Sequence, residues 1–165
     1  MNLKSFLKLV EIQTKIASVT PFLLGIAYTL YRFETIRLLP VLFFLLSMLA
    51  FDMFTTCLNN YMDWKRAQKK SGFNYESHNA IVKYSLSEKT VILTLILLFL
   101  FAAIFGILTF INADLTVLIL GGLSFMIGIL YSAGPLPISR TPLGEIFSGF
   151  FMGFIIPIGI YLQWK

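Results

Sequence analysis

Five long apolar stretches, separated by polar segments, constrain the fold of this chain more than any other feature of its sequence. They run from about residue 16 to 31, 38 to 59, 91 to 111, 115 to 131 and 146 to 164. A helix needs about 20 mostly apolar residues to cross the roughly 30 Å of hydrocarbon in a bilayer. The pattern therefore predicts an all-α, polytopic integral membrane bundle with five transmembrane helices.

The composition of the 165 residues supports this prediction and excludes several other classes of protein. The chain is 58% hydrophobic and 13% charged, whereas a soluble globular domain carries about 25% charged residues. Disordered chains and ordinary soluble enzymes are therefore excluded. The single cysteine, Cys57, excludes an intrachain disulfide and a multi-cysteine zinc site.

The distribution of basic residues predicts the orientation in the membrane. With the N-terminus in the cytoplasm, ten of the 13 Lys and Arg residues lie in cytoplasmic segments, as the positive-inside rule requires. We expect a multi-pass protein of the cell membrane whose 61–89 and 131–143 loops are cytoplasmic. The first fifteen residues are either a short amphipathic helix on the membrane surface or merely a basic flank.

A stripe of polar residues runs along the end of the second apolar stretch. Asp52, Thr56, Asn59 and Asp63 have the spacing of one helix face. A carboxylate within a span normally faces the protein interior or a water-filled cavity. The stripe should therefore point into the bundle, with Asp63 at the mouth of a cavity and Asp52 roughly 16 Å deeper.

The chemistry of this stripe suits a hard cation and an anion. Carboxylate and amide oxygens are typical Mg²⁺ ligands, and Lys65 and Arg66 follow Asp63 directly. A metal–diphosphate site is one interpretation, and a plain helix end with cytoplasmic basic residues is the other. Asp52 has no obvious cationic partner among the five stretches. It is either a proton-relay carboxylate or a buried acid hydrogen-bonded to a neighbouring span.

Two motifs resemble those of a known family. Asn59-Asn60-Tyr61-Met62-Asp63 resembles the first aspartate-rich motif of the UbiA-type intramembrane prenyltransferases. The segment from Tyr131 to Pro137, followed by Pro142-Leu143-Gly144-Glu145, is similar to the signature of the 1,4-dihydroxy-2-naphthoate polyprenyltransferases of menaquinone biosynthesis. The resemblance covers essentially the whole chain and implies the first half of a nine-helix fold.

The resemblance implies a reaction and a set of site residues. A polyprenyl group would pass from an allylic polyprenyl diphosphate to an aromatic acceptor, 1,4-dihydroxy-2-naphthoate, with Mg²⁺ as cofactor. Catalytic and metal-binding roles would fall to Asn59, Asn60 and Asp63. Substrate binding would involve five residues: Lys65 and Arg66 as anion ligands, inferred from charge and position, and Tyr131, Arg140 and Glu145 on the acceptor side.

The sequence also departs from the family pattern. Asn60 stands where the family prefers Asp, and no Asp or Glu follows Glu145 to form the second aspartate-rich motif. We therefore expect an N-terminal half, as a truncated product, a fragment or part of a split enzyme, that is inactive alone and seeks a C-terminal half or another copy. The alternatives are a non-catalytic half-protein that binds lipid or diphosphate, and a small membrane transporter subunit.

Glycine and proline positions give two further expectations. Gly121, Gly122 and Gly128 should allow close approach of neighbouring helices. Pro157 should kink the fifth span.

Overall fold

All the regular secondary structure in the described part of the chain is helical. The computed structural model describes residues 1–67, 79–133 and 137–164. The long helices are α2 (Ile16–Phe33), α3 (Leu38–Arg66), α5 (Glu88–Ile111) and α6 (Leu115–Ser132), followed by a composite helix. That helix comprises α7 (Gly144–Phe150), a π-helical turn (Phe151–Ile155), α8 (Ile156–Tyr161) and a 3₁₀ turn (Leu162–Trp164). The short helices are α1 (Leu3–Leu9), η1 (Ile12–Lys15), α4 (Ala80–Lys83) and η3 (Ile138–Arg140).

Among the described residues, five helical segments are long and apolar enough to cross a membrane, which confirms the predicted fold class. Helix α3 continues to Arg66, beyond the apolar stretch that ends near residue 59, and so includes Asp63 as the polar stripe requires. Its 29 residues span about 43 Å at 1.5 Å per residue. This length exceeds the hydrocarbon thickness, so the hydropathy pattern ends before the helix does.

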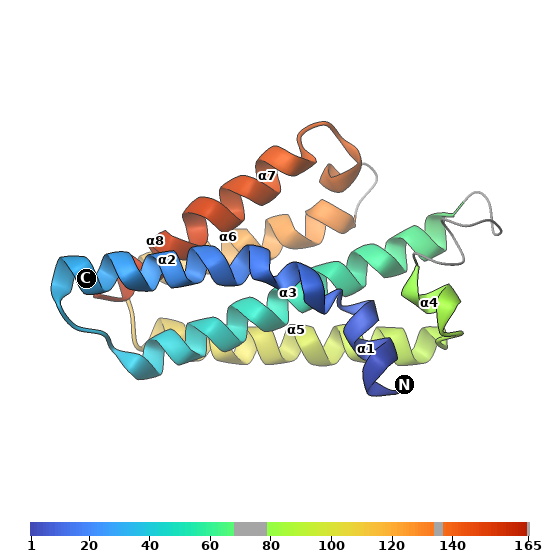
Figure 1. Cartoon of the computed structure of the whole chain (residues 1–165), viewed down its shortest axis with the longest axis horizontal. Coiled ribbons are helices and arrows are strands. Elements are labelled where there is room, and N and C mark those ends of the chain that lie inside the picture. The colour runs from blue at the N-terminus through green and yellow to red at the C-terminus, as the bar shows by residue number, and fades with distance from the viewer. Residues whose placement is uncertain (68–78, 134–136, 165) are drawn as a thin grey trace.

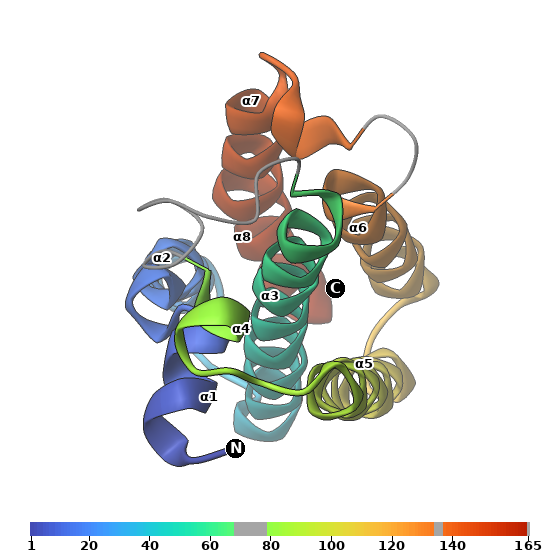
Figure 2. The ribbon, with the colours of Figure 1, turned by 90° about the vertical axis from the view of Figure 1, so that its right-hand side faces the viewer.

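Helix α3 occupies the middle of the bundle. Viewed end-on, α2, α5, α6 and the α7–α8 segment surround it (Figure 2). The contact between α3 and α5 is extensive, and Ser47 donates a hydrogen bond to the carbonyl oxygen of Ala102 across it, 2.8 Å away. Helices α2 and α8 also lie side by side (Figure 1). This arrangement places the polar end of α3 among residues from every long helix.

The C-terminal end of α1 is part of the core. Helix α1 packs against α3 and α4, and Leu9 and Val10 are fully buried. Leu9 belongs to one apolar cluster with Phe54 and Cys57 of α3. The segment is thus a packed helix rather than merely a basic flank.

The glycine expectation holds for Gly128 and fails for Gly121 and Gly122. A Cβ on Gly128 would lie 2.6 Å from the ring of Phe51, so α6 approaches α3 closely there. A Cβ on Gly121 or Gly122 would meet no atom within 4 Å. All three glycines border the cavity, but only at Gly128 does a side chain of a neighbouring helix also come close.

The fifth span is irregular next to Pro157, and the expected kink stays a prediction. Proline lacks the N–H that an α-helix needs at that position. The backbone forms a π-helical turn at Phe151–Ile155, and Pro157 lies in the first turn of α8, which follows directly. Irregular turns of this kind re-satisfy freed backbone groups in membrane helices.

Candidate active site

A cavity of about 600 Å³ lies between α2, α3, α5, α6 and the α7–α8 segment. Apolar side chains line most of it, among them Phe44, Phe51, Phe125 and Phe151. Polar side chains gather at one part of the wall, contributed by the N-terminal segment and α3: Glu11, Thr14, Ser18, Asp52, Thr55, Thr56 and Asn59. The site thus combines a polar region with a long apolar compartment.

The polar stripe of α3 behaves largely as its spacing predicts. Asp52, Thr56 and Asn59 all line the cavity. Asp63 continues the same helix face beyond the cavity, where its side chain is half exposed. We call this end of the bundle the Asp63 end, and Asp52 lies deeper along α3.

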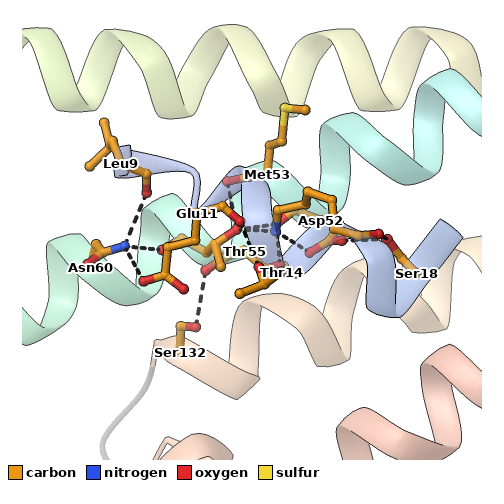
Figure 3. A network of polar contacts seen from close by, with 11 residues as sticks. Leu9, Glu11, Thr14, Ser18, Asp52, Met53, Thr55, Asn60 and Ser132 are labelled. Carbon is orange, nitrogen blue, oxygen red and sulfur yellow. Dashed lines mark hydrogen bonds and ion pairs between the residues drawn. The ribbon is translucent and has the colours of Figure 1, made fainter. Parts of the chain in front are cut away.

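Asp52 has a cationic partner, which corrects the expectation that none is available. The Nζ atom of Lys15 lies 2.6 Å from Oδ1 of Asp52, and the two side chains are only 6% and 11% exposed. Ser18 donates a hydrogen bond to the other carboxylate oxygen over 2.7 Å. Figure 3 shows this contact between Ser18 and Asp52. Of the two readings for Asp52, the acid hydrogen-bonded to a neighbouring span is confirmed.

The sequence does not reveal Lys15 as the partner of Asp52, because Lys15 directly precedes the first apolar stretch and resembles an ordinary basic residue at the end of a span. Its ammonium group also donates to the backbone oxygen of Asp52 over 3.1 Å and to Oγ1 of Thr56 over 2.7 Å. Its three protons are therefore directed at α3. Lys15 does not line the cavity, whereas Asp52 does. Of the two ion-paired residues, only the acidic one therefore borders the cavity.

Asn60 faces the N-terminal segment rather than the cavity. Its buried amide nitrogen donates to the backbone oxygen of Leu9 over 3.1 Å and to Oε1 of Glu11 over 3.2 Å. Both bonds are visible in Figure 3. Asn59 and Asn60 diverge because consecutive helical residues are about 100° apart. The metal-binding role of Asn60 therefore stays a prediction. In the structure its side chain holds the N-terminal segment against α3.

Glu11 is a carboxylate of the cavity wall that sequence reasoning missed. It lines the cavity and has a left-handed backbone conformation, with φ of 49°, at the break between α1 and η1. No hydropathy signal marks it, because its place depends on this turn and on the hydrogen bond from Asn60.

The two sequence motifs meet at the Asp63 end. Nη2 of Arg140, in η3, lies 2.6 Å from Oδ1 of Asp63, and both side chains are about half exposed. Tyr131, near the end of α6, lines the cavity. Glu145, in the first turn of α7, is exposed and lies outside the cavity wall.

Lys65 lies away from Asp63, on the side of α3 that faces α5. Its Nζ atom is 2.6 Å from Oε1 of Glu88, which also accepts a hydrogen bond from the Tyr61 hydroxyl over 2.8 Å. The ammonium group lies 5.5 Å from the centre of the Trp64 ring. Arg66 is the last residue of α3 and is partly buried. Lys69, Lys70, His78 and residues 134–136 of the second motif lie outside the described residues.

The described residues at the Asp63 end provide too few ligands to hold a metal ion without a substrate. In the described part of the chain, no group of three or more His, Cys, Asp or Glu residues is placed to hold a metal ion alone. Asn59 and Asp63, four residues apart on α3, offer an amide oxygen and a carboxylate. Mg²⁺ takes one or two carboxylates and fills its remaining positions with water and substrate phosphates.

Comparison with known proteins identifies the family. The family model described as the UbiA prenyltransferase family matches residues 18–163. The 1,4-dihydroxy-2-naphthoate octaprenyltransferase of Bacillus subtilis (strain 168) is 31% identical over 151 residues, which are 91% of this chain and 48% of that protein. The chain thus spans about half the length of this relative. No solved structure matches it. With residues 18–163 matched, the chain belongs to the UbiA prenyltransferase family.

Proposed function

We propose that this chain supplies the substrate cavity of an intramembrane prenyltransferase. The enzyme transfers a polyprenyl group from an allylic diphosphate to an aromatic acceptor of the 1,4-dihydroxy-2-naphthoate type. The observation that carries the proposal is the cavity itself, whose polar wall includes Asn59 while aromatic and aliphatic side chains line the rest. Asp63 follows Asn59 on the same face of α3, beyond the cavity. An amphiphile with a charged head and a long apolar tail matches this division.

In this proposal the diphosphate binds at the Asp63 end, which faces the cytoplasm. Asn59 and Asp63 are the ligands toward Mg²⁺, which when bound would neutralise negative charge on the diphosphate leaving group. Arg140, already 2.6 Å from Asp63, would donate hydrogen bonds to phosphate oxygens, for which a guanidinium is well shaped. The prenyl chain would extend along the apolar wall past Phe51 and Gly121.

The reaction is an alkylation of an electron-rich ring. The bond between the allylic carbon and the diphosphate oxygen breaks, and a new carbon–carbon bond forms to the aromatic ring. With dihydroxynaphthoate as acceptor, the carboxylate at the attacked carbon leaves as CO₂. Tyr131 borders the cavity near this point, and the apolar walls exclude water that would otherwise capture the allylic cation.

The proposal includes a requirement for further protein. The 165 residues carry one acidic motif of the kind that binds metal and diphosphate, and no Asp or Glu follows Glu145. A diphosphate leaving group carries several charges in a partly dehydrated site and needs neutralisation on more than one face. We propose that a C-terminal half or a second copy of the chain supplies the rest.

Binding of a prenyl diphosphate tests the function without requiring turnover. The chain, reconstituted in nanodiscs, is titrated with radiolabelled farnesyl diphosphate in Mg²⁺ and in EDTA. We expect Mg²⁺-dependent binding that weakens at least tenfold in Asn59→Ala and Asp63→Ala variants. Glu34→Gln, at the opposite end of α2, is the matched control and should bind as the wild type does. Equal binding by all four proteins, or no dependence on Mg²⁺, would overturn the proposal.

A further inference from the structure

Asp52 is an ion-paired carboxylate on the wall of a largely apolar cavity. Lys15 supplies the counter-charge over 2.6 Å, yet Asp52 lines the cavity and Lys15 does not. Burying an ionised group in an apolar compartment is costly without such a partner. The arrangement therefore presents a negative group toward the ligand space while its positive partner remains behind it.

The hydrogen bonds around Asp52 leave part of its acceptor capacity open. Oδ1 accepts from Lys15 and Oδ2 accepts from Ser18. An ionised carboxylate can accept about four hydrogen bonds. The Lys15 ammonium, in contrast, directs its three protons at Asp52 and Thr56. The group available to a ligand is thus an acceptor, and it selects a ligand that donates a hydrogen bond.

The position of Asp52 along α3 places it deeper in the cavity than the proposed diphosphate site. Asp52 is seven residues from Asn59, which corresponds to about 10 Å along a helix. With the diphosphate at Asn59 and Asp63, the allylic carbon and the ring that attacks it lie between that end and the apolar compartment. Asp52 borders this zone from the α3 side, and Thr55 and Thr56 lie on the cavity wall beside it.

We propose that Asp52 binds a ring hydroxyl of the aromatic acceptor, which donates a hydrogen bond to the carboxylate. Lys15 and Ser18 are positioning residues that fix the carboxylate. The inference rests on the proposed function and assigns an acceptor-binding role to a residue outside both sequence motifs. It predicts selectivity for phenolic or naphtholic acceptors over their methyl ethers, because an ether oxygen has no proton to donate.

The test uses two fluorescent probes, 4-hydroxy-2-naphthoate and 4-methoxy-2-naphthoate, which differ in that a methyl group replaces the hydroxyl proton in the second. Their binding to the full chain in nanodiscs is measured by fluorescence titration. A hydrogen bond to a charged group corresponds to about a tenfold difference in affinity or more. We expect the wild type to bind the hydroxy probe at least about tenfold more tightly than the methoxy probe.

The decisive variant replaces the ion pair by a neutral, hydrogen-bonding pair, Lys15→Gln with Asp52→Asn. This double variant avoids leaving one buried charge alone, and circular dichroism checks that it is folded. We expect its preference for the hydroxy probe to fall to about twofold or less. Thr109→Val, elsewhere on the same cavity wall, is the matched control and should keep the wild-type preference.

The outcomes separate this inference from the proposed function. Farnesyl diphosphate binding is measured on the same samples and should be retained in the double variant. Equal affinity of the wild type for the two probes, or a preference that survives in a folded double variant, overturns the role of Asp52. If the probe experiment fails but the wild type still binds farnesyl diphosphate in a Mg²⁺-dependent manner, only the role of Asp52 is overturned and the proposed function stands. If the wild type does not bind farnesyl diphosphate in this manner, both the proposed function and the role of Asp52 are overturned.

Discussion

Asp63 and Arg140, 77 positions apart in the sequence, form an ion pair with 2.6 Å between Oδ1 and Nη2. One residue ends the aspartate-containing motif of α3, and the other lies in the 3₁₀ turn before α7. The contact brings the two sequence motifs to the same end of the bundle. Both side chains remain about half exposed, so both are accessible to a ligand.

Replacing Asp63 by Ala should affect function far more than folding. A half-exposed ion pair contributes little to stability, so membrane insertion and the melting temperature should stay close to wild-type values. In a full-length enzyme that carries this segment, prenyl transfer should fall by at least about a hundredfold, as expected for lost stabilisation of leaving-group charge. Transfer is measured with radiolabelled prenyl diphosphate in membranes at saturating Mg²⁺, and near-wild-type activity would contradict the role.

Replacing Lys15 by Met should destabilise the fold strongly. The substitution leaves the Asp52 carboxylate buried without its counter-charge, which costs about 3–5 kcal/mol in comparable sites. Lys65→Met is the matched control, because Lys65 also forms a 2.6 Å ion pair but is 45% exposed. Thermal unfolding in detergent should show a large decrease in melting temperature for Lys15→Met and a small one for Lys65→Met. Similar decreases in melting temperature for the two variants would show that the buried Lys15–Asp52 pair contributes no more to stability than the exposed Lys65–Glu88 pair.

The comparison of Lys15 with Lys65 also shows what the sequence can predict. The five helices, the polar stripe of α3 and the placement of the 61–89 and 131–143 loops at one end of the bundle follow from hydropathy and helical spacing, whereas the direct contact between Asp63 and Arg140 does not. The Lys15–Asp52 pair does not, because it joins residues 37 positions apart and Lys15 directly precedes an apolar stretch.

Lys65 and Asn60 show a second limit of sequence reasoning. Both lie within or beside the motif, yet helical geometry turns Lys65 toward Glu88 and Asn60 toward Leu9. Proximity in sequence therefore groups residues that a helix distributes over different faces.

Two glycines of α6 should respond differently to the same substitution. Gly128→Leu would force a side chain into the space of Phe51, 2.6 Å from the position of a Cβ, and should lower the melting temperature. Gly121→Leu meets no atom within 4 Å of its Cβ and should leave folding nearly unchanged while filling part of the cavity. We expect this variant to bind farnesyl diphosphate several-fold more weakly. Equal stability of the two variants would contradict the close contact at Gly128.

The proposed orientation can be tested by cysteine labelling in intact cells. Cys57 is fully buried and is replaced by Ala to give an unreactive background. A cysteine introduced at Ser139, in η3 beside Arg140, should react with a membrane-impermeant maleimide only after the cells are opened. Labelling in intact cells would place the Asp63 end outside the cytoplasm.

The purified 165-residue chain should show no prenyl transfer when it is alone and monomeric. Its acidic motif provides Asn59 and Asp63 toward one face of the diphosphate, and departure of this group needs charge neutralisation on further faces. The assay contains polyprenyl diphosphate, 1,4-dihydroxy-2-naphthoate and Mg²⁺, with the oligomeric state determined by light scattering. Turnover by a demonstrated monomer would refute the requirement for further protein.

Photo-crosslinking tests the central claim most directly, because it reports where the prenyl chain lies. A farnesyl diphosphate analogue with a diazirine at its tail is irradiated with the membrane-embedded chain, and the labelled peptides are identified by mass spectrometry. We predict Mg²⁺-dependent labels on cavity residues such as Phe44, Gly121 and Phe151, which excess unlabelled polyprenyl diphosphate suppresses. Labels confined to outward-facing residues such as Leu93 and Ile104, without suppression by competitor, would contradict the account.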